Sequence, residues 1–196
     1  MLTWDELLQE IYKGEKINME CKRAEREVPQ SVYETYSSFA NTTGGIIVLG
    51  VEEDKTKATP KERFIVRGVS DPEKMQNDFW NTINSQKVNE NILVDDDVYI
   101  AKNGDISLLV IHVPKADYTM RPVYKGENPY KGTFKRNHEG DYHAKEYEVR
   151  AMFRDQLSEG YDQTIHEGYT MDDIDADTLK RYRTLCLTPG TLIMCG

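Results

Sequence analysis

The feature that most constrains the fold is residues 39–51, Phe-Ala-Asn-Thr-Thr-Gly-Gly-Ile-Ile-Val-Leu-Gly-Val. Apolar and aromatic residues recur at helical spacing just before and into it, which predicts an amphipathic helix over residues 31–43. Gly44 and Gly45 can adopt the positive φ that ends a helix. The uncharged β-branched run that follows predicts a strand over residues 45–52, covered on both faces. The chain therefore combines a packed helix with a fully buried strand.

Two local patterns refine this segment. Ser31 and Glu34 have the spacing of an N-terminal capping box, so Ser31 is predicted to cap the helix. A Gly-Gly pair beside a strand can also form a phosphate-binding loop, but such a loop lies between a strand and a following helix. Here the order is helix, glycines and strand, without the Gly-Lys-Ser/Thr that a P-loop requires. The glycines are interpreted as a helix stop.

The other elements follow from similar patterns. Thr3 and Glu6 form a second capping-box pattern, which opens a helix to Tyr12. Asp71 followed by proline predicts the start of a helix that runs to about Gln86. Further predictions are strands at 19–22, 64–66 and 130–135, a hairpin of 98–101 with 106–113 around Asn103-Gly104, and helices at 143–157 and 178–185. Strands and helices in this order predict an α+β fold, in which helices cover a mixed β-sheet.

Composition narrows the class of protein. The chain has 196 residues with 30% charged side chains, and no apolar run approaches the roughly 18–20 residues of a membrane span, so no membrane partner is expected. The N-terminus lacks the basic-then-apolar pattern of a signal peptide. The three cysteines, Cys21, Cys186 and Cys195, form no CxxC pair. A reducing, cytoplasmic location is therefore expected.

Positive charge is concentrated in residues 115–136. Six basic and two acidic side chains lie there, on a chain whose net charge is −9. An acidic total argues against a protein that is basic over its whole surface. One basic segment on an acidic body is typical of a local phosphate-facing surface, but a solvated hairpin with incidental lysines has the same composition. Aromatic residues alternate with these cations and could stack on bases.

Several segments form a recognisable series. Residues 15–22 read Glu-Lys-Ile-Asn-Met-Glu-Cys-Lys, residues 39–45 read Phe-Ala-Asn-Thr-Thr-Gly-Gly, and residues 50–54 read Gly-Val-Glu-Glu-Asp. The series resembles the Schlafen AlbA_2 domain, whose pattern is Glu-x-x-x-x-Glu-Phe-Lys, a helix, Ala-Phe-Ala-Asn-Thr-x-Gly-Gly and Gly-Val-x-Asp. The similarity continues to residues 121–124 and to 134–136, the family's Tyr-x-Arg strand, and covers roughly residues 10–160.

The chain departs from that pattern in three places. Cys21 stands where the family has phenylalanine, and Ser38 where alanine is common. The acidic run after Gly50 has one carboxylate more than the family pattern, so either Glu53 or Asp54 can match the family's aspartate.

The resemblance implies a nucleic-acid-binding domain, for DNA or RNA, of a bacterial-type transcriptional regulator. Under this interpretation the basic segment contacts phosphates, which position a protein without reading sequence. No cofactor is expected, and a homo-oligomer is left open. The residues expected to contact phosphates are Arg121, Lys125, Lys131, Lys135 and Arg136, joined by Lys22 and Arg23 if the strand at 19–22 lies beside them.

An enzymatic alternative also follows from the resemblance. Some family members are metal-dependent endoribonucleases, and their carboxylates match Glu15, Glu20 and one of Glu53 or Asp54. Hard carboxylates of this kind hold Mg²⁺ or Mn²⁺, so Glu15, Glu20 and Asp54 would be the metal ligands. The same side chains could instead be surface carboxylates paired with neighbouring lysines and arginines.

The domain organisation is the last inference. Residues 1–160 are expected to form the AlbA_2-like domain, and residues 161–196 a helical tail or the start of a following region. The apolar residues 192–194 in this tail, together with the acidic body, leave a protein-interaction module as a third hypothesis. His138 and His143 have no cysteine nearby, so a zinc site is not expected. His112 lies in an apolar strand and is predicted to be a core or edge residue.

Overall fold

The computed structural model describes residues 1–14, 17–162 and 175–187. The chain divides into two compact units, Met1–Ser158 and Glu159–Gly196. Within the described residues, no helix combines the length and the apolar character that crossing a membrane requires.

The centre of the first unit is a four-stranded sheet in the order β1-β2-β6-β5. β1 (Met19–Lys22) runs parallel to β2 (Gly45–Leu49). β6 (Ile106–Val113) pairs antiparallel with β2 on one side and with β5 (Val98–Asn103) on the other. The sheet is therefore mixed, with β1 and β5 as its edge strands. The predicted strand at 19–22 and the predicted hairpin are both confirmed.

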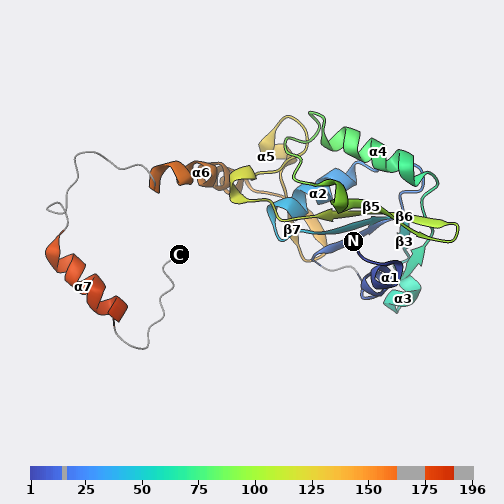
Figure 1. Cartoon of the computed structure of the whole chain (residues 1–196), viewed down its shortest axis with the longest axis horizontal. Helices are drawn as coiled ribbons and strands as arrows, with labels where there is room; N and C mark the ends of the chain where they lie inside the picture. The colour runs from blue at the N-terminus through green and yellow to red at the C-terminus, as the bar shows by residue number, and fades with distance from the viewer. Residues whose placement is uncertain (15–16, 163–174, 188–196) are drawn as a thin grey trace. The chain divides into compact units, whose positions relative to one another are not determined.

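Helices cover both faces of this sheet. α1 (Trp4–Tyr12) packs with β1 and the middle strands on one face. α2 (Ser31–Asn41) and α4 (Pro72–Ile83) enclose the other face, where Ile47, Leu109 and Ile111 form the core with them. Figure 1 shows α1 and α4 on opposite sides of the sheet. The predicted α+β fold, a mixed sheet covered by helices, is confirmed.

The double glycine ends α2 and starts β2. Gly44 has φ +75°, and its N–H donates to the carbonyl oxygen of Phe39 at 2.9 Å. A β-carbon on Gly44 would lie 2.8 Å from the carbonyl oxygen of Val113, and one on Gly45 would lie 2.7 Å from the Phe39 ring. Side chains are thus excluded where the helix turns into the sheet. The predicted helix stop is confirmed.

The capping predictions have different outcomes. At α1 the reciprocal box is confirmed, since Thr3 N–H donates to Glu6 Oε2 at 2.8 Å and Glu6 N–H donates to Thr3 Oγ1. At α2 it is wrong, because Gln30 is the N-cap and makes no side-chain cap bond. Ser31 is already the first residue of the helix, whereas a capping residue lies just before the helix with an extended backbone.

The predicted strand 45–52 is two strands. Gly50, with φ +99°, separates β2 from β3 (Val51–Glu53). β3 leaves the main sheet and pairs antiparallel with β4 (Phe64–Val66), which follows the short helix α3 (Pro60–Arg63). A β-carbon on Gly50 would lie 2.8 Å from the Leu108 side chain, so this bend requires glycine.

The predicted strand 130–135 is also corrected. Asn128 accepts the N–H of Tyr130 at 2.9 Å and starts α5 (Pro129–Gly132), a single helical turn. The strand begins later, as β7 (Phe134–Asn137), and forms a hairpin with β8 (Gly140–His143). Because residues 140–143 pair with β7, helix α6 (Glu146–Asp162) begins three residues later than predicted. Single 3₁₀ turns at Asp95–Asp97 and Tyr118–Met120 complete the unit.

The second unit contains α7 (Ala176–Leu187), which confirms the helix predicted at 178–185. Asp175 accepts hydrogen bonds from the N–H and the hydroxyl of Thr178, and these bonds lower its pKa below the ordinary value. An anionic side chain at the start of a helix is favourable. The apolar residues 192–194 lie outside the described residues.

Candidate nucleic-acid interface

The β7–β8 hairpin forms a two-stranded sheet separate from the main sheet, and polar side chains of α2 hold it in place. Asn41 Nδ2 donates to the carbonyl oxygen of Phe134 at 3.1 Å. Ser37 Oγ accepts the N–H of Phe134 at 3.0 Å, and Thr42 Oγ1 accepts the N–H of Arg136 at 3.0 Å. The first strand of the hairpin is therefore fixed by α2 through side-chain hydrogen bonds.

Arg136 lies in the interior under this hairpin. Its side chain is 1% exposed, with Nη2 2.9 Å from Glu20 Oε2 and Nη1 3.0 Å from Asp141 Oδ1. The guanidinium carbon also lies 5.1 Å from the centroid of the Phe39 ring. A guanidinium enclosed in this way joins β1, α2 and both hairpin strands. The expectation that Arg136 contacts phosphate is therefore corrected, because no surface of its side chain is available.

Most of the other predicted phosphate contacts are ion-paired. Lys125 Nζ lies 2.6 Å from Glu34 Oε1, and Lys135 Nζ lies 2.5 Å from Glu148 Oε1. Lys22 Nζ donates to Glu20 Oε1 at 2.8 Å, with both side chains 15% exposed. These cations neutralise carboxylates of the domain itself, which explains part of the local excess of positive charge.

The remaining predicted cations differ in exposure. Arg23 is exposed and pairs with Glu25 and with Glu52 across the β1–β3 side of the unit. Arg121 is half-buried, and its Nε is enclosed. Lys131 is exposed on α5, and no carboxylate within the described residues lies close enough to pair with it. Lys131 is thus the predicted cation most available to a ligand.

The carboxylates of the nuclease hypothesis do not converge in the described part of the chain. Glu20 is ion-paired with Lys22 and Arg136. Glu53 belongs to the β3–β4 sheet, and its Oε2 lies 3.3 Å from Lys55 Nζ. Asp54 accepts the N–H and hydroxyl of Thr56, which lower its pKa. Among the described residues no cluster of three His, Cys, Asp or Glu could hold a metal ion; Glu15 lies outside these residues.

The outer face of the hairpin carries exposed aromatic and basic side chains. Lys135 and Tyr142 are cross-strand partners, with exposed fractions of 37% and 60%. Residues directly opposite each other in a ladder project from the same face, so these two lie side by side. Four further residues are exposed on α5 and around the start of α6: Tyr130, Lys131, Lys145 and Tyr147.

A hollow of about 480 Å³ lies between α2, α5 and the hairpin. Two lysines and two glutamates reach it, Lys125 and Lys131 with Glu34 and Glu127, so it is not strongly cationic. Its floor includes Phe134 and His143, whose rings are 4.3 Å apart.

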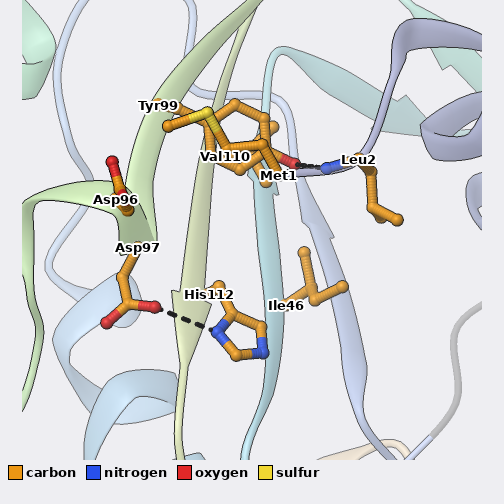
Figure 2. Close-up of a pocket in the computed structure, with 8 residues that line it drawn as sticks. All are labelled: Met1, Leu2, Ile46, Asp96, Asp97, Tyr99, Val110 and His112. Atoms are coloured by element: carbon orange, nitrogen blue, oxygen red, sulfur yellow. Dashed lines mark hydrogen bonds and ion pairs between the residues drawn. The ribbon is translucent and has the colours of Figure 1, made fainter.

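Figure 2 shows a second hollow, of about 370 Å³, on the sheet face that α1 covers. Ile46, Val110 and Tyr99 line it, with His112 and Asp97 at one end, 3.1 Å apart. No lysine or arginine is among its lining residues. His112 projects into this hollow with its side chain 55% exposed. It was predicted to be a core or edge residue; it is not in the core, and its strand β6 is paired on both sides.

Comparison with protein families explains the shared motifs. The model of the Schlafen, AlbA_2 family matches residues 15–145. This chain belongs to the Schlafen AlbA_2 family. A second model, a domain of unknown function (DUF8451), matches residues 150–190, beyond the AlbA_2 domain. A search of curated proteins found no match.

The AlbA_2 domain resembles a domain of known structure. The latter is the N-terminal domain, determined by solution NMR, of a protein from Nitrosomonas europaea named as related to the ATP-dependent DNA helicase RecG. The identity is 28% and the TM-score 0.54; the match covers 74% of this chain and 94% of that domain. The likeness supports the AlbA_2 fold.

Sequence reasoning missed the polar side of α2 as the attachment of the hairpin. Thr35, Ser37, Ser38 and Asn41 are all buried, although the prediction placed only the apolar face inward. A signal was present, because residues 35–45 contain no charged side chain. Charged side chains are almost never fully buried unless paired, so their absence allows the polar side of the helix to be buried too.

Proposed function

We propose that the AlbA_2 domain of this chain binds nucleic acid through the outer surface of the β7–β8 hairpin and the adjoining α5. The observation that carries the proposal is the cross-strand pair on one face of the hairpin, where Tyr142 is exposed and Lys135 is partly exposed and paired with Glu148. Lysines supply phosphate contacts, and aromatic rings supply stacking surfaces. Lys131 on α5 and Lys145 after β8 are exposed, and we include both in the proposed surface.

The comparisons support the same class of function. The resembling domain belongs to a protein named for a relation to a DNA helicase, which is consistent with nucleic acid as the ligand. Regulation of transcription and a cytoplasmic location remain parts of the proposal. Arg136, which the sequence led us to expect at phosphate, is not part of this surface, since its guanidinium stabilises the hairpin from within.

The test is fluorescence anisotropy of the 196-residue chain with labelled single- and double-stranded DNA and RNA. We expect binding that weakens as salt rises, because lysine contacts release counterions. The double variant Lys131→Gln with Lys145→Gln should bind several-fold more weakly. Lys74→Gln with Lys102→Gln removes the same charge from α4 and the edge strand β5, away from the hairpin, and should bind like the wild type.

Two results would contradict the proposal. One is the absence of binding to every probe at low salt. The other is an equal loss of affinity in both double variants, which would indicate a response to net charge alone. Parallel samples with Mn²⁺ and with EDTA test the nuclease hypothesis, since only cleavage makes the anisotropy fall with time in a metal-dependent way.

A further inference from the structure

Tyr142 is placed differently from the aromatic residue on the other face of the hairpin. Phe134 faces inward and is 7% exposed, and its ring lies 4.3 Å from that of His143, at an interplanar angle of 34°. Tyr142 faces outward and is 60% exposed. Within the described residues no ring or cation–π partner is found for Tyr142. A large ring that stays in water contributes little to the core and leaves its surface free for a ligand.

Gly140 positions the Tyr142 ring. The two residues are two apart on β8 and therefore project from the same face. A β-carbon on Gly140 would lie 2.7 Å from Tyr142 Cε2 and 2.9 Å from its Oη. The ring thus lies over the glycine, in space that a β-carbon would contest, so a side chain at position 140 would move the ring from this place.

One cation lies beside this ring. Lys135 is directly opposite Tyr142 in the ladder, and the 2.5 Å contact with Glu148 holds the lysine beside the hairpin. Lys145, three residues beyond Tyr142, is exposed, and its ammonium lies 5.9 Å from the centroid of the Tyr147 ring. Sites for single strands combine a basic track for the backbone with aromatic rings on which successive bases stack.

We infer that Tyr142 is a stacking platform for one unpaired base, and that the hairpin thereby prefers single-stranded nucleic acid to duplex. This inference rests on the proposed function and specifies its ligand. In a duplex the base faces are already stacked on their neighbours, so an exposed ring on a hairpin cannot reach them. In a single strand a base can turn onto the ring while its phosphate meets Lys135 or Lys145.

The experiment uses the full chain and three labelled probes: a single strand, the same strand with abasic sites, and the duplex. Tyr142→Leu should weaken binding of the single strand roughly five- to 100-fold, whereas Tyr142→Phe should bind like the wild type. Gly140→Ala keeps the ring but displaces it, and should also weaken binding. Val94→Ala, which removes another exposed apolar side chain (64% exposed) at the 3₁₀ turn Asp95–Asp97 and outside the proposed surface, is the control and should bind like the wild type.

The abasic probe isolates stacking from charge. The wild type should bind it more weakly than the intact strand, and Tyr142→Leu should bind both alike. Two results would overturn the inference while leaving the proposed function standing. One is equal binding of the intact strand by Tyr142→Leu and the wild type, and the other is equal binding of the intact and the abasic strand by the wild type. Failure of the wild type to bind any probe would contradict the proposed function and the inference together.

Discussion

The side-chain amide of Asn41 pairs with the backbone of Val123 as one strand residue pairs with another. Asn41 Nδ2 donates to the Val123 carbonyl oxygen at 2.7 Å, and Oδ1 accepts the Val123 N–H at 2.9 Å. Val123 is fully buried, so water cannot replace either bond. The asparagine of the Phe-Ala-Asn-Thr motif therefore stabilises the fold rather than contacting a ligand.

Replacement of Asn41 by alanine should destabilise the AlbA_2 domain by about 2–4 kcal/mol, because buried backbone groups of Val123 and Phe134 lose their partners. Urea unfolding of the full chain measures the loss. Asn84→Ala is the control, since Asn84 donates to an exposed carbonyl at the end of α4, and it should shift the free energy of unfolding by less than about 0.5 kcal/mol. Similar losses in both variants would contradict the role given to Asn41.

Arg136→Met should also act on stability rather than on binding. The substitution leaves the carboxylates of Glu20 and Asp141, each 15% exposed, without their shared cation. Removing one partner of a buried ion pair costs about 3 kcal/mol. Denaturant unfolding gives this cost, with Arg150→Met on the exposed face of α6 as control. A variant of normal stability with a reduced salt dependence of binding would restore Arg136 as a phosphate contact.

Glu34→Gln should strengthen nucleic-acid binding. The substitution releases Lys125, whose ammonium is now 2.6 Å from the Glu34 carboxylate. A freed lysine beside α5 should raise affinity a few-fold and steepen the dependence on salt by up to about one unit. Glu73→Gln releases Lys102 on β5 with the same change in net charge. Anisotropy titrations that show equal effects for the two variants would mean that Lys125 does not face the ligand.

Glu148 should make the hairpin sensitive to acid. The hydrogen bond from Lys135, and then the one from the backbone of Lys145, lower the pKa of Glu148 below its ordinary 4.5. A carboxylate with a lowered pKa stabilises the fold at pH values above its ordinary pKa. This stability is lost as the pH falls through the lowered pKa. Glu148→Gln should therefore be less stable than the wild type at pH 7.

The difference between Glu148→Gln and the wild type should shrink as the pH falls below about 4.5, the ordinary value. Urea midpoints measured across that range give the comparison. Glu139→Gln alters an exposed glutamate of the hairpin turn and should change little at any pH. A constant difference for Glu148→Gln across the range would show that packing, not charge, explains its effect.

The sequence predicted the parts of the fold that local patterns control. The box at Thr3, the proline after Asp71 and the double glycine at Gly44 each specify a backbone state, and each prediction is confirmed. Predictions failed where tertiary contacts decide the structure. The strand predicted over 45–52 breaks at Gly50 because β3 pairs with β4 and not with the main sheet, and this pairing joins segments separated in the sequence.

The candidate site was less predictable than the fold. A basic segment does not reveal which carboxylates will pair with its side chains. Lys125, Lys135 and Arg136 were therefore all predicted to contact phosphate. Their partners Glu34, Glu148 and Glu20 come from three other elements. The alternation of β7 did contain part of the answer, since Lys135 and Arg136 must project from opposite faces. The prediction of a strand over 130–135 hid that alternation at its end.

In this hairpin, attachment to the domain and presentation of outward side chains depend on different groups. The side chains at the end of α2 bind backbone atoms and not outward side chains: Ser37, Asn41 and Thr42 contact the backbone of Phe134–Arg136, and Asn41 also contacts that of Val123. Exchange of outward residues, or a longer turn at His138, would therefore leave the main sheet and its register intact. This tolerance is limited to the outward residues, because the inward Arg136 ties the hairpin to Glu20 of β1.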